Sequence, residues 1–156
     1  MRSDEDFLRE AIALALANVQ EAGGRPFGAM VVRDGEVLAT GVNEIAATGD
    51  PTAHAELSAI RRAAQVLGTP RLDGCVVYAS GQPCPMCLSA MYLTGVTRVR
   101  FACSNADGEP FGLSTAPIYA ELAKPLEAQA MDVRHQPVGG AGGELYAAWK
   151  ARQNRT

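Results

Sequence analysis

Residues 1–43 contain one segment with helical periodicity, and two short strand-like segments follow it. Apolar residues recur along one face of residues 4–21, and two glycines follow that segment. Residues 27–32 and 36–43 have the composition of strands, and they flank Asp34-Gly35, a dipeptide typical of tight hairpin turns. We therefore expect an opening helix followed by an antiparallel hairpin.

The remaining pattern predicts helices that alternate with single strands. Helices are expected at 51–66, 84–93, 118–122 and 144–152, and strands at 75–79, 96–102 and 131–135. Because helices separate these later strands, the strands should lie parallel. The order predicts an α/β fold: a three-layer α/β/α sandwich around a five-stranded mixed sheet.

Length and composition are those of an ordinary globular chain. The chain has 156 residues, of which 47% are hydrophobic and 20% charged, and no internal repeat or long linker divides it. We therefore expect a single domain over residues 1–156. The sequence has no apolar run of the roughly 18 residues that a membrane span needs, and its charged beginning does not resemble a signal peptide. These features favour a cytoplasmic protein with no membrane partner.

Net charge and cysteine content narrow the classes of function. The net charge is −3 and the isoelectric point about 5.4, which does not favour nucleic acid as a partner, because phosphate binding needs a basic surface. A small neutral substrate has no such requirement. The chain has four cysteines, and paired cysteines in a cytoplasmic protein are more often metal-binding or catalytic than disulfide-bonded.

Two short motifs contain the candidate chemistry, and each lies at a predicted helix start. The first is Thr52-Ala53-His54-Ala55-Glu56, and the second is Pro83-Cys84-Pro85-Met86-Cys87. Cys84 and Cys87 share a helical face, so both thiolates can bind one metal ion, with His54 as a third ligand. A Cys-x-x-Cys pair alone could be a redox pair or half of a structural zinc site. No second pair is present here, and three protein ligands are typical of a catalytic zinc. We expect one Zn²⁺ per chain.

Glu56 follows the histidine by two residues and completes the expected chemistry. It can reach a water at the metal without being a ligand itself. Hydrolytic deamination needs a group that first removes a proton from water and then donates protons to the ring and to the departing ammonia, and a carboxylate can do both. His-x-Glu followed by Pro-Cys-x-x-Cys is the signature of zinc deaminases that act on nucleobases.

At these motifs the sequence resembles the cytidine deaminase-like zinc deaminase superfamily, in particular bacterial guanine deaminases and tRNA adenosine deaminases. The resemblance extends from about Phe7 to Trp149 and includes Pro26-Phe27-Gly28-Ala29. It implies the cytidine deaminase-like fold, zinc bound by the His-Cys-Cys set, and a glutamate that moves protons. It also implies a homodimer, in which the C-terminal segment can be exchanged between subunits and close the partner's site.

The resemblance further implies substrate contacts. Asn43 would hydrogen-bond the base, the backbone of Ala55 would bind the substrate next to the metal, and Phe27 would form part of the pocket wall. The chain departs from the family at Gln82, where an acidic residue usually precedes Pro-Cys. Its loop at 112–115 also lacks the carboxylate of guanine-type members, and Ser114 is expected there, near the pocket mouth.

The sequence thus predicts a zinc-dependent hydrolase of cyclic C–N bonds that releases ammonia from a free nucleobase or base-like heterocycle. Guanine or a related aminopurine or triazine is favoured. One alternative is a tRNA adenosine deaminase, which shares the zinc chemistry but needs a basic surface around the pocket. Another is a non-catalytic zinc-binding relative, which would have no use for Glu56.

Overall fold

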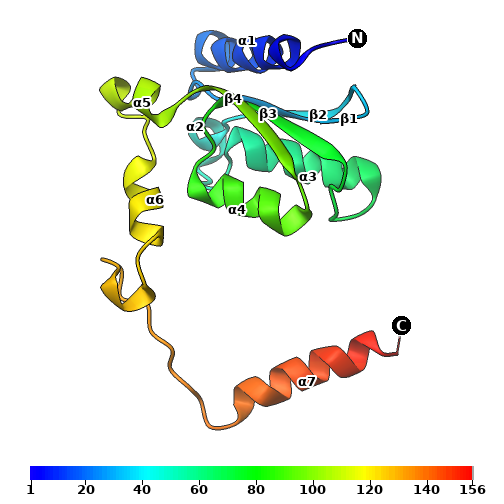
Figure 1. Cartoon of the computed structure of the whole chain (residues 1–156), viewed down its shortest axis with the longest axis vertical. Helices are drawn as coiled ribbons and strands as arrows, with labels where there is room; N and C mark the ends of the chain where they lie inside the picture. The colour runs from blue at the N-terminus through cyan, green and yellow to red at the C-terminus, as the bar shows by residue number, and fades with distance from the viewer. Residues whose placement is uncertain (156) are drawn as a thin grey trace. The chain divides into compact units, whose positions relative to one another are not determined.

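The computed structural model describes residues 1–155 and contains a mixed β-sheet with helices on both faces (Figure 1). The elements in chain order are α1 (Asp4–Ala22), β1 (Gly28–Arg33), β2 (Glu36–Val42), α2 (Ile45–Thr48), α3 (Ala55–Leu67), β3 (Cys75–Gly81), α4 (Pro85–Thr94), β4 (Arg98–Cys103), α5 (Asn105–Gly108), η1 (Glu109–Phe111), α6 (Ala116–Leu122), η2 (Leu126–Ala128) and α7 (Ala141–Gln153).

The strand order in the sheet is β2-β1-β3-β4. β1 pairs antiparallel with both β2 and β3, whereas β3 and β4 are parallel. The expected hairpin and the expected parallel pairing of later strands are therefore confirmed. At the hairpin turn, Asp34 has a φ of 52° and Gly35 a φ of 79°, the two positive angles that a type I′ turn requires.

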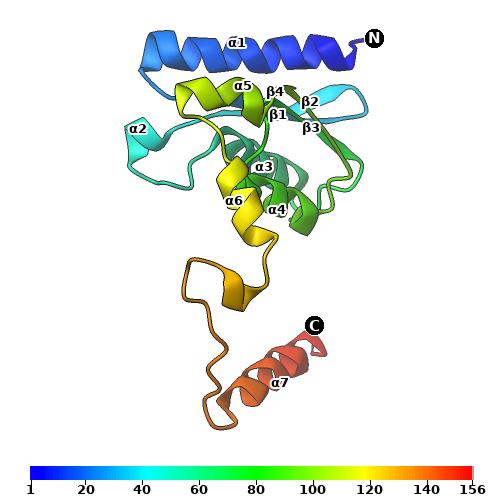
Figure 2. The same ribbon diagram turned by 60° about the vertical axis from the view of Figure 1, so that its left-hand side comes forward.

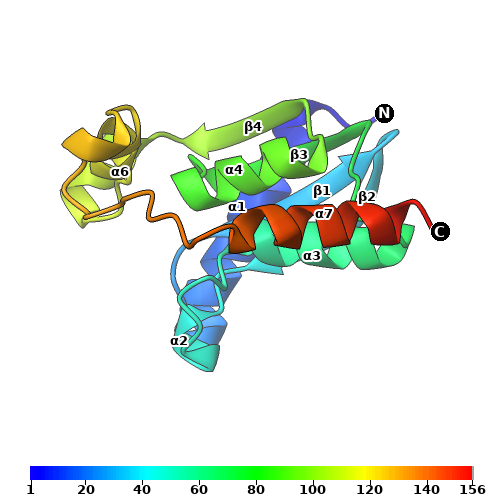
Figure 3. The same cartoon turned by 90° about the horizontal axis from the view of Figure 1, so that it is seen from below.

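Alternate residues of β1 form two cores, one on each face of the sheet. Met30 and Val32 pack with Phe7 and other buried residues of α1. Ala29 and Val31 pack with buried residues of α3 and α4 on the opposite face. Figure 2 shows α1 on one side of the strands and α3 and α4 on the other, and Figure 3 shows these two helices on their common face. The predicted three-layer α/β/α architecture is confirmed.

Two glycines allow the helices to lie directly against the sheet. A Cβ atom at Gly41 of β2 would lie 2.3 Å from the carbonyl oxygen of Ala55, the first residue of α3. A Cβ atom at Gly28 of β1 would lie 2.5 Å from the carbonyl oxygen of Ala11 in α1. Both distances are too short for a real contact, so the close packing of each helix depends on the missing side chain.

The predicted fifth strand at residues 131–135 is wrong. In the described part of the chain these residues form no strand, and β3 is the one strand that pairs with β4. The apolar positions Met131 and Val133 alternate with charged ones, as in a strand. However, a strand forms only when its backbone finds a pairing edge, and alternation does not supply that edge. The sheet therefore has four strands instead of five.

Backbone contacts group the chain into two units, Met1–Tyr119 and Ala120–Thr156. The first unit contains the whole sheet and both cores. In the second unit, none of the described residues is buried, and α7 exposes Leu145, Tyr146 and Trp149. Among residues 1–155, no helix has the length and apolar character needed to cross a membrane.

Candidate active site

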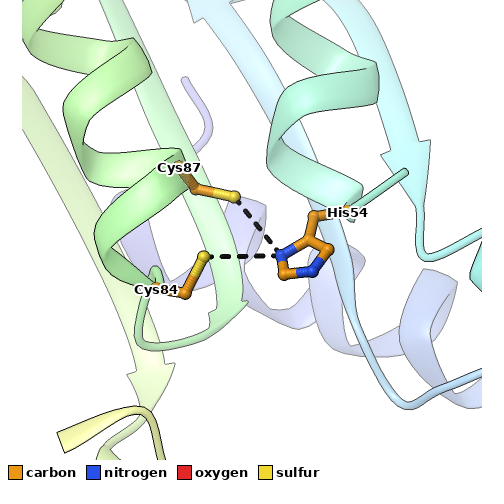
Figure 4. Close-up of side chains that lie close together, drawn as sticks. All are labelled: His54, Cys84 and Cys87. Atoms are coloured by element: carbon orange, nitrogen blue, oxygen red, sulfur yellow. Dashed lines mark hydrogen bonds between the residues drawn. The ribbon is translucent and has the colours of Figure 1, made fainter. Parts of the chain in front are cut away.

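Three side chains from the starts of two helices converge on one point (Figure 4). His54 is the N-cap residue of α3, and Cys84 is the N-cap residue of α4. Both have extended backbone angles, and Pro85 begins α4, where its fixed φ suits a first helical position. Cys87 lies in the first turn of α4 and is fully buried. The local chain at both helix starts therefore directs the three side chains toward one another.

The distances among these side chains fit a tetrahedral zinc site. The Nδ1 atom of His54 lies 3.4 Å from Sγ of Cys84 and 3.6 Å from Sγ of Cys87. A tetrahedral zinc with ordinary Zn–S and Zn–N bond lengths holds its nitrogen and sulfur ligands about 3.6 Å apart. The donor set of one imidazole and two thiols also matches the chemistry that zinc prefers. These residues can therefore hold one zinc ion with little rearrangement.

A hydrogen bond links the two thiols. The hydrogen bond from Cys87 lowers the pKa of Cys84 to about 4, with a further contribution from His54. The same hydrogen bond and burial raise the pKa of Cys87. The hydrogen bond to Cys84 also raises the pKa of His54. A divalent cation between the two sulfurs favours the thiolate form of both, so that metal binding at this site releases a proton.

Glu56 lies in the first turn of α3, beside the two sulfurs, and is only 6% exposed. Burial is the main cause that raises the pKa of its carboxyl from 4.5 to about 7, and the negative charge on Cys84 acts in the same direction. A carboxyl with this pKa can both accept and donate a proton near neutral pH. It is therefore placed and tuned for proton transfer.

A cavity of about 160 Å³ opens in front of this group. A cavity of this size admits a single small heterocycle. Its lining consists of Arg25, Phe27, Asn43, His54, Glu56, Gln82, Cys84, Gly112, Leu113, Ser114 and Thr115.

Three of the four residues expected to contact substrate line this cavity: Phe27, Asn43 and Ser114. Asn43 is buried, and its Oδ1 accepts a hydrogen bond of 3.1 Å from the backbone nitrogen of Ile45. Its Nδ2 is consequently the atom that can donate to a ligand. The fourth residue, Ala55, has a fully buried side chain that does not line the cavity, and the expected contact of its backbone stays a prediction.

Sequence reasoning gave no pocket role to Arg25, Gln82, Leu113 or Thr115, all of which line the cavity. Arg25 directly precedes Pro26-Phe27, and a cation next to an expected pocket aromatic was a signal that could have identified it. In the sequence, Gln82 stands out only as the position where related proteins usually have a carboxylate. Leu113 and Thr115 lie in a loop, and no local pattern indicates which way a loop of this kind folds.

Comparison with known proteins agrees with this geometry. Residues 1–103 match the family model of the cytidine and deoxycytidylate deaminase zinc-binding region. The chain is 45% identical to the guanine deaminase of Bacillus subtilis over 123 residues, which cover 79% of each protein. An X-ray structure of that enzyme matches with a TM-score of 0.89 at 38% identity and covers 96% of this chain and 95% of its own.

A second group of relatives modifies RNA. The chain is 39% identical to the tRNA-specific adenosine deaminase of Aquifex aeolicus over 98 residues. The match covers 63% of this chain and 64% of that protein. The same zinc-binding motifs are thus compatible with more than one class of substrate. The family match, the fold and the site together establish that this chain belongs to the cytidine and deoxycytidylate deaminase zinc-binding family and is a zinc-dependent hydrolase that deaminates nucleobases.

Proposed function

We propose that this chain releases ammonia from a free nucleobase or a base-like heterocycle, and that guanine or a related aminopurine or triazine is its substrate. The observation that carries this proposal is the His54, Cys84 and Cys87 group with the buried Glu56 beside it, at one small cavity. The cavity volume suits a free base better than a base within a polynucleotide. The similarity to the Bacillus subtilis guanine deaminase supports a purine.

In this proposal His54, Cys84 and Cys87 hold the zinc ion. When bound, zinc supplies Lewis-acid chemistry that lowers the pKa of a water molecule toward neutrality. Glu56 first moves a proton from the attacking water to a ring nitrogen, and then moves the proton of the newly added hydroxyl group to the leaving amino group. The new C–O bond replaces the C–N bond, and ammonia leaves. The pKa of about 7 allows Glu56 to act in both directions.

The other lining residues would orient the heterocycle. Phe27 offers an aromatic face to the ring, and Nδ2 of Asn43 is a donor for a ring or exocyclic acceptor. Ser114 lies in the loop at the cavity and offers a hydroxyl in place of a carboxylate. The backbone of Ala55 would contact the substrate next to the metal.

We also propose that the protein is a cytoplasmic homodimer. Tyr92 and Leu93 at the end of α4 are 78% and 79% exposed, and an exposed apolar surface of this kind is typical of a protein interface. Leu145, Tyr146 and Trp149 expose a second apolar surface on α7. A second copy of the chain could cover both. Light scattering at several protein concentrations measures the oligomeric state directly.

The test of the proposed function is ammonia release by zinc-loaded protein from guanine, adenine, cytosine, ammeline, their nucleosides where these exist, and a tRNA anticodon stem-loop. Turnover of one small base that is lost in Glu56→Ala supports the proposal. Turnover of the stem-loop alone would make the protein a tRNA adenosine deaminase. Zinc binding without turnover of any compound would favour a non-catalytic relative.

A further inference from the structure

Arg25 places a permanent positive charge at the cavity that contains His54 and Glu56. Its side chain is exposed, and within residues 1–155 its guanidinium makes no hydrogen bond and no ion pair. Most arginines of the unit Met1–Tyr119 form an ion pair, as Arg62 does with Glu44 and Arg98 with Asp4. Arg25 thus has five N–H donors available to a ligand of the cavity that it lines.

The backbone of Arg25 is held in place by a buried side chain. Nδ2 of Asn18 donates a hydrogen bond of 2.8 Å to the carbonyl oxygen of Arg25. It donates a second one, of 2.9 Å, to the carbonyl oxygen of Asn43, another residue of the cavity lining. Asn18 is 7% exposed, so water cannot easily replace either bond. The position of Arg25 beside the cavity is therefore built into the fold.

The neutral polar groups of the lining are also donors. Oε1 of Gln82 accepts a hydrogen bond of 2.8 Å from the backbone nitrogen of Asn105, which leaves Nε2 as the donor for a ligand. Oγ of Ser114 accepts a hydrogen bond of 3.2 Å from Ala116, so its hydroxyl hydrogen can be donated. Glu56 is the one carboxylate in the lining. Apart from Glu56, the cavity thus offers donors and a positive charge to its ligand.

On the basis of the proposed function, we propose that Arg25 is a specificity-determining residue, and that, among the heterocycles that the site deaminates, it favours those carrying an anionic oxygen substituent. The amino group that is replaced must face Glu56 and His54, so the remote edge of the ring is left to the other lining residues, Arg25 among them. A guanidinium binds a carboxylate or phosphate through two parallel hydrogen bonds. A remote edge made of amino groups would instead place donors against donors.

The experiment compares kcat/KM for ammonia release within two matched pairs: pterin with pterin-6-carboxylate, and guanosine with guanosine 5′-monophosphate. Wild-type protein should prefer the anionic member of at least one pair. The first pair detects a carboxylate and the second a phosphate. Arg25→Ala should lower that preference about ten- to hundredfold, because charged hydrogen bonds are lost. Arg25→Lys should retain part of it, since lysine keeps the charge but not the planar fork.

Arg33→Ala is the matched control, because Arg33 is also exposed but lies outside the cavity lining. A preference unchanged in Arg25→Ala, or a wild-type preference for the neutral member of both pairs, would overturn the inference. If the wild type releases no ammonia from these four compounds, guanine and the other bases of the panel above test the proposed function separately, and silence on all of them means that it fails. Calorimetric binding of the same pairs then decides the inference: tighter binding of an anionic member that depends on Arg25 supports it, and equal affinities overturn it.

Discussion

Gly41→Ala should impair catalysis far more than Gly28→Ala, although the two substitutions disturb packing almost equally. A Cβ atom at Gly41 would lie 2.3 Å from the carbonyl oxygen of Ala55 and 2.8 Å from the nitrogen of Ala59. At Gly28 the corresponding distances are 2.5 Å to the oxygen of Ala11 and 2.8 Å to the nitrogen of Ala15. The first substitution displaces α3, whose start contains the site, and the second displaces α1, which contributes no residue to the cavity lining.

The magnitudes follow from these contacts. An ordinary van der Waals separation requires each helix to move by about 1 Å, and overpacking of this kind costs about 1–3 kcal/mol of stability. Both variants should show this loss. A displacement of about 1 Å at reacting groups costs about 100-fold in rate. Because His54 and Glu56 move with α3, kcat should fall about 100-fold in Gly41→Ala and by less than about 3-fold in Gly28→Ala.

Two assays separate the effects. Urea unfolding of the zinc-loaded variants measures the stability loss, and ammonia release at saturating substrate, corrected for zinc content, measures kcat. Measurements at a temperature where both variants are fully folded exclude unfolding as the cause. Equal losses of kcat in the two variants, or wild-type kcat in Gly41→Ala, would show that the contact between β2 and α3 does not position the site.

Three further predictions concern the same unit. The pKa of Glu56 is raised from 4.5 to about 7, so in the zinc-free protein this carboxyl should contribute a loss of stability as pH rises through this range, whereas the lowered pKa of Cys84 acts in the opposite direction. Glu56→Gln should remove that loss, so that its free energy of unfolding exceeds that of the wild type by up to about 3 kcal/mol above pH 7. A difference between the two proteins in urea unfolding that does not change with pH would contradict this. Cys87→Ser should lower bound zinc from one ion per chain to near zero by plasma mass spectrometry, whereas Cys103→Ser, at an exposed cysteine, should keep it. Asn18→Ala removes the two hydrogen bonds to the carbonyl oxygens of Arg25 and Asn43. This should lower the free energy of unfolding by about 1–3 kcal/mol and raise KM more than it lowers kcat. An unchanged KM would indicate that Asn18 supports only the fold.

The sequence by itself determined the features that depend on neighbouring residues. The opening helix begins at a capping box in which Ser3 and Asp6 bond each other's backbone, an interaction that spans three residues. The tight turn at Asp34-Gly35 needs two adjacent positive φ angles. The pair Cys84 and Cys87 shares a helical face because of its spacing, and Pro85 starts that helix. Such features are encoded in one short segment and can be recognised without a fold.

The tertiary structure decided whatever depends on segments far apart in sequence. His54 and Cys84 are 30 residues apart, and only the packing of α3 and α4 on one face of the sheet brings them together. Residues 131–135 have strand-like alternation but form no strand, because pairing requires an edge that alternation cannot specify. Arg25 and Gln82 come from separate loops and line one cavity. The members of the metal-binding group could be recognised because each of the two motifs is local in sequence. The places of Arg25 and Gln82 at the cavity could not be predicted, because loop conformation depends on the whole fold.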